Sequence, residues 1–367
     1  MKSTFIKIAT CLIVGIITVS ILYGLSDKLT HQQNSFYRYF PPHPAVYDNA
    51  IDLKYNSYYF AGVSGDNIYL SSLTAPLHML KVNPATMDTS HYTIKINDND
   101  PLKFSSSTRV NILSPYFYIA DGITPRILRG TLGQWTAKRF MYDSAYFNDA
   151  KPIGSKSFTL RTISAKTNEN ILGKESNIKP HVLLRDHLLE KQVDGIFCTD
   201  GMLHYNKELS KIIYLYHYRN QYMVMDTTLN LLYKGRTIDT NTIAKIKTTS
   251  IESNHSKTIS EPPLVINKNS YTYGNYLFVY SGLMAKNENK DTFNETSVID
   301  VYNITSDTYE FSIYIYPYRK QKLKRFIITD KYLLGIHDQY LVIYNLNPKW
   351  FKELIPKNKF DQEILSR

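Results

Sequence analysis

The side chains best suited to chemistry in this sequence are histidines and carboxylates that could bind a metal, and three of them lie close together: His181, His187 and Glu190. Imidazole nitrogens and carboxylate oxygens are common zinc ligands. In a helix, His187 and Glu190 would share a face, whereas in a strand they would point to opposite faces. Because this region has a strand pattern, we expect no metal site there. The other histidines considered are dispersed, which favours packed or surface positions: His43, His78, His91, His204, His217, His255 and His337.

Acidic and amide side chains offer a second metal chemistry, because a hard cation such as Ca²⁺ takes several oxygen ligands. The run Asn97–Asp100 has this composition, but Pro101 follows where a calcium loop would use glycine, so a solvated turn is favoured. Four more aspartates would contribute to a site if the fold gathered them around one axis, and the sequence leaves their placement open: Asp121, Asp194, Asp200 and Asp226.

Nucleotide and nucleophile chemistry lack their sequence signatures. Neither GxGxxG nor GxxxxGK(S/T) occurs. The segment Gly62–Asp66 departs from GxSxG at its last position, so Ser64 is expected in a hairpin turn. Cys198 is the one cysteine outside the N-terminal apolar run, and we expect a small buried apolar residue. The sequence thus indicates no catalytic, cofactor-binding or metal-binding residue and no cofactor, and we expect a protein that is not an enzyme.

A basic, aromatic segment is the remaining candidate for binding. Arg319–Arg325 holds five basic residues and follows three tyrosines, Tyr314, Tyr316 and Tyr318. Such a pattern can bind single-stranded nucleic acid, but the topology predicted below places it outside the cytoplasm, so no nucleic-acid partner is expected. We expect an exposed loop between blades; the leading functional alternative is attraction to anionic lipid headgroups near the anchor, worth up to about 1 kcal/mol per basic residue. The excess of 43 Lys+Arg over 32 Asp+Glu fits this and specifies no partner.

The N-terminal segment predicts a membrane anchor. Ile8–Leu25 carries no charge, and a helix of this length reaches about 27 Å, close to the roughly 30 Å of a bilayer's hydrocarbon core. Lys2 and Lys7 precede it, so the positive-inside rule places the N-terminus in the cytoplasm and the rest outside. A cleaved signal peptide is the alternative, although no small-residue cleavage site follows the run. Ile8–Cys11 matches a lipoprotein cleavage box only loosely.

The rest of the chain predicts an all-β fold. With 43% hydrophobic and 20% charged residues and two cysteines, it is neither disordered nor a disulfide scaffold, and its 31 tyrosines favour strands. Lys211–Thr240 shows three strand-like runs joined by turn residues. The same pattern recurs in five further sets: Asn67–Ile96, Tyr116–Phe140, Ser157–Leu184, Tyr276–Tyr316 and Phe326–Asn347. Six such sets favour a six-bladed β-propeller, with a β-sandwich as the alternative.

The ends of the chain complete this prediction. The last set has three strands, so Val46–Lys54 is expected to supply its outer strand and close the ring. Deleting residues 46–54 should then destabilise the whole domain. We divide the chain into a cytoplasmic N-terminus (1–7), a transmembrane signal-anchor helix (8–25), a tether (26–45), the β-propeller (46–355) and a C-terminal tail (356–367).

One stretch also resembles a known group. Leu188–Asp226, with the pairs Asp194-Gly195 and Asp200-Gly201 and a Tyr-Arg-Asn-Gln turn, resembles uncharacterised membrane-anchored or lipoprotein propellers of Bacteroidetes, of the TolB-like six-bladed class. The resemblance implies a propeller that serves as a binding surface, and it assigns no functional residue.

These observations lead to one functional expectation and two alternatives. We expect a single-pass protein of a Gram-negative inner membrane, whose periplasmic propeller binds a protein, peptide or envelope ligand through loops that gather at one face. The first alternative is a metal-dependent, for example calcium-dependent, hydrolase of the lactonase or strictosidine-synthase-like kind. The second is an accessory subunit resembling the propeller of amine dehydrogenases. Ligand identity and oligomeric state do not follow from the sequence.

Overall fold

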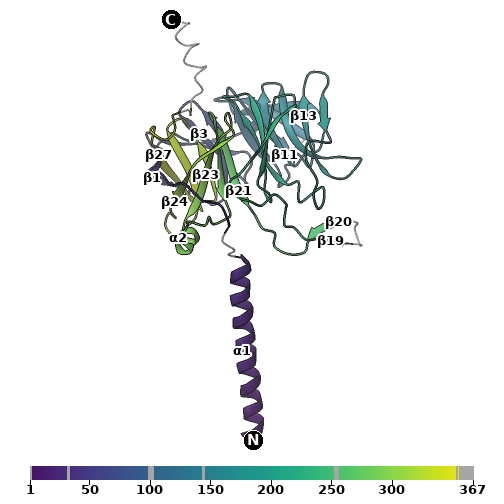
Figure 1. The fold of residues 1–367 in the computed structure, drawn as a ribbon. Helices are drawn as coiled ribbons and strands as arrows, with labels where there is room; N and C mark the ends of the chain where they lie inside the picture. The colour runs from purple at the N-terminus through teal and green to yellow at the C-terminus, as the bar shows by residue number, and fades with distance from the viewer. Residues whose placement is uncertain are drawn as a thin grey trace.

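The computed structural model describes residues 2–30, 34–97, 103–142, 145–251, 256–352 and 354, and the structural statements below concern these residues. A long N-terminal helix, α1 (Lys2–Thr30), precedes a domain built almost entirely of strands (Figure 1). Within α1, Thr4–Leu22 is long and apolar enough to cross a membrane, with a mean hydropathy of 2.4. A signal sequence has the same features, so α1 fits a membrane-anchored or an exported chain.

The strand domain is a six-bladed β-propeller. Each blade is a sheet whose four main strands are antiparallel and follow one another in sequence, except in the last blade. The first strand of each blade contacts the first strand of the next, and the first strands of blades 6 and 1 also meet, so the ring is closed. The predicted propeller is therefore confirmed, and the alternative of two face-packed sheets is wrong.

The first three blades are described by their strands in chain order. Blade 1 comprises β2 (Tyr58–Ser64), β3 (Asn67–Ser72), β4 (His78–Val82) and β5 (Thr89–Thr93). Blade 2 comprises β7 (Arg109–Leu113), β8 (Tyr116–Asp121), β9 (Arg126–Thr131) and β10 (Thr136–Tyr142), and β6 (Lys95–Ile96) pairs in parallel with β10. Blade 3 comprises β11 (Asp149–Gly154), β12 (Ser157–Ile163), β13 (Asn170–Ser176) and β14 (Val182–Arg185).

The other three blades include two insertions. Blade 4 comprises β15 (Gly201–Asn206), β16 (Lys211–Tyr216), β17 (Gln221–Met225) and β18 (Leu231–Arg236), and the hairpin β19 (Thr248–Ile251) and β20 (Ser256–Ile259) follows it. Blade 5 comprises β21 (Asn267–Tyr273), β22 (Tyr276–Ser281), β23 (Ser297–Asn303) and β24 (Thr308–Ile315), with α2 (Lys290–Glu295) between β22 and β23. Blade 6 comprises β25 (Arg325–Ile328), β26 (Tyr332–His337), β27 (Tyr340–Leu346) and β1 (Ala45–Asp52).

The outer strand of blade 6 comes from the start of the domain. β1 pairs antiparallel with β27, from Ala45 opposite Leu346 to Asp52 opposite Tyr340. The expectation that the N-terminal piece closes the ring is thus confirmed. β1 covers the edge of β27, and the chain continues from β1 into the first strand of blade 1. The last blade is therefore covalently linked to the first.

The hydrophobic core lies between neighbouring blades. One buried cluster joins Leu70 and Leu80 of blade 1 to Leu334 and Ile343 of blade 6. A second cluster joins Ile213 and Val224 of blade 4 to Leu277 and Tyr302 of blade 5. Each sheet therefore buries both faces, which explains the nearly continuous apolar runs in the middle strands of each blade.

The alternating strand directions place all loops on two faces. The anchor-side face, as we call it, carries the connections between blades and the turns between second and third strands. Asn34 lies on it, since its Nδ2 donates to the Met284 carbonyl oxygen at 3.1 Å in the turn that contains α2. Figure 1 shows α2, β19 and β20 on the side from which α1 emerges. The opposite face carries the turns between first and second strands.

The segment that we expected to be a tether is packed from Asn34 onward. The Arg38 side chain is fully buried and forms two hydrogen bonds with the Asp300 carboxylate, at 2.7 and 2.9 Å. Arg38 also pairs with Glu288 and donates to the Leu283 carbonyl oxygen at 2.8 Å. Phe40 stacks on Tyr314 with 4.1 Å between ring centroids. Residues 34–44 thus run along blade 5 from the anchor-side face to the opposite face, where β1 begins.

Candidate functional site

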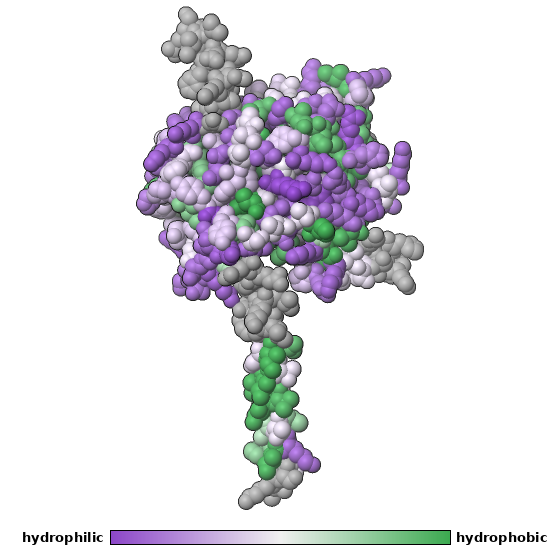
Figure 2. Space-filling view, in the orientation of Figure 1, coloured by the Kyte–Doolittle hydropathy of each residue, from purple (hydrophilic) through white to green (hydrophobic). Residues whose placement is uncertain are grey.

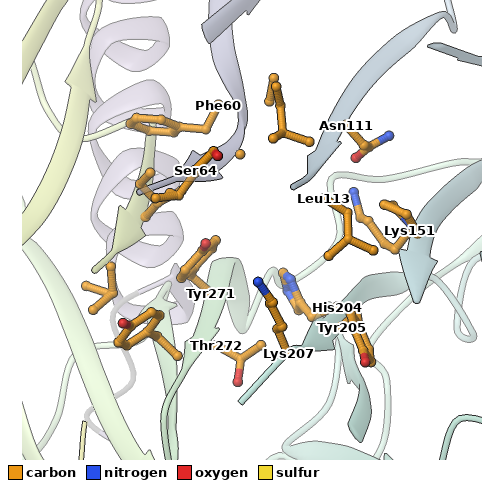
Figure 3. Close-up of a pocket in the computed structure, with 18 of the residues that line it drawn as sticks. Phe60, Ser64, Asn111, Leu113, Lys151, His204, Tyr205, Lys207, Tyr271 and Thr272 are labelled. Atoms are coloured by element: carbon orange, nitrogen blue, oxygen red, sulfur yellow. The ribbon is translucent and has the colours of Figure 1, made fainter. Parts of the chain in front are cut away.

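The central axis of the propeller holds a cavity of about 470 Å³ that is lined by the first strands of all six blades (Figure 3). These inner strands are short and mixed in polarity, as in the sequences DAKPIG of β11 and NKNSYTY of β21. The lining extends into the turns of the opposite face at Gly65, Ser114 and Lys207. The mouth of the cavity therefore lies on the opposite face, away from the point where the chain leaves α1.

The cavity wall carries more positive than negative charge. Lys151, Lys207 and Arg325 contribute cations, and Glu208 contributes one carboxylate. The Nζ atom of Lys151 lies 3.1 Å from a carboxylate oxygen of Asp149.

Two of these cations are not neutralised by a neighbour. In the described residues, neither Lys207 nor Arg325 has a carboxylate oxygen within 4 Å. Desolvation by the surrounding protein and the charge of Arg109 both lower the pKa of Arg325. The wall therefore presents uncompensated positive charge that an anionic ligand would stabilise.

His204 adds a neutral hydrogen-bonding group to this wall. Its Nε2 lies 2.7 Å from the Ser270 hydroxyl on the neighbouring inner strand. Burial, and secondarily the charge of Lys151, lowers the pKa of His204 to about 3. The imidazole is therefore uncharged at neutral pH. Figure 3 shows the side chains of His204 and Lys207 among those that line the cavity.

The neutral state of His204 predicts a pH dependence of stability. The pKa of His204 is about 3 in the folded chain and about 6.5 in a model peptide. Between these two pH values, the unfolded chain binds a proton at His204 and the folded chain does not. Stability should therefore fall as the pH is lowered through this window. The substitution His204→Gln keeps a polar side chain and removes the titration.

This prediction is checked by denaturant unfolding at pH 7, 5 and 4. We expect the variant to lose less stability than the native protein over this range. Burial also lowers the pKa of His78 and His337, but these residues are present in both proteins and cancel in the comparison. Equal losses in the two proteins would contradict the assignment.

Tyrosines complete the polar wall of the cavity. Burial, and secondarily the carboxylate of Glu208, raises the pKa of Tyr271 and of Tyr273. Their hydroxyls therefore remain protonated and can donate hydrogen bonds at any physiological pH. Positive charge, phenol hydroxyls and a neutral imidazole together suit the binding of an acidic, partly apolar ligand.

The four aspartates considered for an axial site do not line this cavity. Asp121 accepts hydrogen bonds from the Ser105 backbone and side chain, at 2.9 and 2.7 Å. Asp194 accepts from the backbone amides of Ile196 and Phe197 in a turn. Asp200 pairs with Arg161.

The fourth aspartate, Asp226, also caps a turn. Burial would raise its pKa, but hydrogen bonds from Asn230 and Thr228 lower it to about 2. The question that the sequence left open is therefore answered: none of these four residues lines the axial cavity, and each is used by its own turn or ion pair.

The histidine segment has a different structure from the one predicted. β14 ends at Arg185, and His187 and Glu190 lie in the following connection, so neither the helix nor the strand reading holds for them. Glu190 pairs with Lys234, and His181 contacts the Ser176 carbonyl oxygen. In the described part of the chain, no group of three or more His, Cys, Asp or Glu residues could hold a metal ion. Of the run Asn97–Asp100, residues 98–100 lie outside the described residues.

Three simpler predictions are confirmed. Cys198 is fully buried, and its thiol donates to the Asp194 carbonyl oxygen. Ser64 ends β2 and leads into the hairpin turn at Gly65, which has a φ of 57°. The basic segment is the exposed connection between blades 5 and 6, where the Arg319 guanidinium lies over the Tyr340 ring at 5.0 Å.

No residue of the cavity wall was predicted to belong to a site at the propeller axis: Ser64 was expected in a turn, and His204 was one of the dispersed histidines. In blades 1 to 5 the predicted strand sets begin at the second strand and omit the inner strand, which has no long apolar run. Arg325 was named only as part of the basic segment. A signal was present, because 16 to 35 residues were left unassigned between successive sets from the first to the fifth, which is room for at least one more strand, and a four-stranded blade requires a strand in that gap.

Comparison with known proteins identifies the fold. No protein-family model matches this sequence, and no curated protein resembles it. The crystal structure of a DUF4221-family member from Bacteroides vulgatus matches with a TM-score of 0.52 and 13% identity, over 86% of this chain and 99% of that one.

Two other solved structures match at lower scores. A protein from Bacteroides fragilis that is described as exported has a TM-score of 0.47 and 10% identity, over 86% of this chain and 95% of that one. Virginiamycin B lyase from Staphylococcus aureus has a TM-score of 0.48 and 9% identity, over 82% and 99%. Identities this low show the shared fold alone. The DUF4221-family structure agrees with the resemblance at the level of the fold, and the TolB-like class and lipoprotein status stay predictions.

Proposed function

We propose that this chain is a binding module that α1 holds at a membrane, with the propeller outside the cytoplasm and the cavity mouth facing away from the anchor. In a Gram-negative cell, α1 would lie in the inner membrane and the propeller in the periplasm. The apolar stretch Thr4–Leu22 supports the anchor. The ligand that fits best is an acidic peptide segment of a protein or envelope component, bound at the cavity mouth.

The observation that carries this proposal is the positive charge of Lys207 and Arg325 on the cavity wall, where neither has a carboxylate oxygen within 4 Å among the described residues and both are exposed, so that a ligand can reach them. An approaching carboxylate would accept charge-assisted hydrogen bonds from these cations, which are stronger than hydrogen bonds between neutral groups. The volume of about 470 Å³ lies in the range of small-ligand sites and would take two or three side chains.

The enzymatic alternatives receive no support from the arrangement of side chains. A calcium-dependent hydrolase needs several oxygen ligands that converge on one point. The aspartates that could supply them are used in turns away from the cavity, and the described residues contain no other such group. Nothing in the described geometry favours an accessory subunit of a dehydrogenase either.

Calorimetric titration of the full chain in detergent tests the proposal. The probes are an acetylated triglutamate peptide and an acetylated trilysine peptide, at low ionic strength. We expect the acidic peptide to bind and the basic peptide not to bind. The double variant Lys207→Gln, Arg325→Gln should bind the acidic peptide with an affinity about tenfold lower than that of the native protein.

The matched control removes two exposed basic residues outside the cavity. Lys138 lies on β10 and Arg236 on β18, and the double variant Lys138→Gln, Arg236→Gln changes the net charge by the same amount without touching the cavity wall. Its affinity for triglutamate should equal that of the native protein within about twofold. Equal weakening by the two double variants would show that the peptide responds to overall charge, and the proposed site would then be rejected.

A further inference from the structure

The anchor-side face exposes large apolar side chains around the whole ring. Three of them are tyrosines in connections between blades: Tyr55, Tyr146 and Tyr316, each with more than 60% of its surface exposed. Tyrosine combines an apolar ring with a polar hydroxyl, and it is enriched where proteins meet the membrane–water interface.

Aliphatic side chains fill the remaining positions of this face. Leu73 and Ile123 lie in turns between second and third strands, and Ile163 is the last residue of β12 before such a turn. Val193 and Ile243 lie in the connections that follow blades 3 and 4. Together with the tyrosines, these residues come from loops on every side of the ring. Figure 2 shows apolar surface at the lower edge of the propeller, on the side from which α1 emerges, and further such areas near the middle of this view and at the upper edge.

The opposite face is different. Among the described residues in its loops, the exposed large apolar side chain is Ile178, in the turn between β13 and β14. Other exposed apolar side chains lie on the outer strands and on the segment that covers blade 5; of these, Leu231 at the start of β18 and Val46 and Tyr47 near the start of β1 lie toward the opposite face. Exposed apolar residues scattered singly are ordinary, but this concentration on one face requires a reason.

The anchor keeps this face close to the bilayer. α1 continues for eight residues beyond Leu22, to Thr30, which adds about 12 Å at 1.5 Å per residue. From Thr30 to Asn34 the chain can span at most about 15 Å. Asn34 is fixed to the anchor-side face by its hydrogen bond to Met284. The face is therefore held within a few tens of ångströms of the hydrocarbon core.

We propose that the anchor-side face rests on the surface of the bilayer that α1 crosses, with its exposed tyrosines and aliphatic side chains inserted among the lipid headgroups. Exposed lysines of the basic segment, such as Lys320 and Lys322, lie on the same face and attract anionic headgroups. This inference rests on the proposed anchorage. It also explains the position of the cavity mouth, which docking leaves open to the aqueous side.

Fluorescence quenching in the full chain tests this docking. In a Cys11→Ser background, where Cys198 is buried, a single cysteine at Ile123 or at Ile178 carries the environment-sensitive dye NBD. The two positions are matched, with 61% and 57% exposure on opposite faces. Nanodiscs of phosphatidylethanolamine and phosphatidylglycerol hold one copy each and contain headgroup-labelled nitroxide lipid. We expect quenching at position 123 to exceed that at position 178 by about threefold or more.

A second variant separates insertion of the face from insertion of the dye. Tyr316→Ser with Ile243→Ser removes two apolar contacts in the connections between blades 5 and 6 and after blade 4, across the ring from the dye on blade 2, and should reduce quenching at position 123, with an unchanged circular dichroism spectrum. Equal quenching at the two positions, or no effect of this double variant, would overturn the docking. Flotation of the same samples reports anchorage separately: a chain that fails to float with the nanodiscs would overturn both proposals. Quenching that requires several copies per disc would instead assign the face to a second copy.

Discussion

Replacing Arg38 with methionine is expected to lower the free energy of unfolding by about 3–5 kcal/mol, because it leaves two carboxylates buried without a cation. The Arg38 side chain is completely buried, and so is that of Glu288, while the side chain of Asp300 is 3% exposed. Burial alone would lower the pKa of Arg38, but Asp300 and Glu288 outweigh it and raise the pKa well above its ordinary value. The contacts with these two carboxylates, which exist only in the folded chain, thus stabilise the charged form of Arg38.

The measurement is denaturant unfolding of the full chain in detergent, followed by circular dichroism. Arg236 provides the matched control, because it is an exposed arginine of the outer strand β18, and Arg236→Met should change stability by less than about 0.5 kcal/mol. A loss below about 1 kcal/mol for Arg38→Met would contradict the view that this residue fixes the segment to blade 5.

Arg38 also shows a limit of sequence analysis. Residues 26–45 are polar, aromatic and Pro-rich, which is typical of a linker. The partners of Arg38 lie 250 and 262 positions away in the sequence. A local sequence pattern cannot predict a contact between residues so far apart in the chain. The same segment supplies Phe36 to a buried cluster with Ile266 and Leu283. A role of this kind depends on tertiary contact alone.

The fold could be predicted from the sequence because its signals are local and recur in every blade. The middle strands of each blade are buried on both faces, as in β22 (YLFVYS), where every residue is buried. Such strands give apolar runs that can be counted, and six sets of them were found. The shortage of one strand in the last set further predicted that β1 would pair with β27, which the register confirms.

The candidate site could not be predicted in the same way, because the strands that form it have no local, repeated sequence signal. An inner strand such as β15 packs Leu203 between blades and presents His204 to the neighbouring strand and the cavity. Its sequence GMLHYN therefore has neither a continuous apolar run nor a marked alternation. The chemistry of the cavity comes from single residues on six strands, and the order of blades around the axis is needed before they can be seen as one group. Sequence motifs could not reveal that group.

Replacing Ile51 with proline is expected to destabilise the whole domain by about 3 kcal/mol, because it breaks the pairing that closes the ring. The backbone N–H of Leu53 donates to the Gln339 carbonyl oxygen at 2.8 Å, whereas the N–H of Ala50 donates to the Asn49 side chain at 2.8 Å. Since donors alternate along a strand, the N–H of Ile51 faces Leu341 of β27, its partner in the register. Proline removes this donor.

Ala50→Pro is the matched control, because proline is tolerated where the N–H of an edge strand faces solvent. We expect this variant to lose less than about 1 kcal/mol. Deleting residues 46–54 would also sever the link to Arg38, so the pair of point variants isolates closure itself. Unfolding in denaturant and hydrogen exchange of β27 amides measure the two effects. If this closure stabilises the ring, amide hydrogen exchange should accelerate across blade 6 in Ile51→Pro and not in Ala50→Pro. Equal stability of the two proline variants would show that pairing of β1 with β27 does not stabilise the domain.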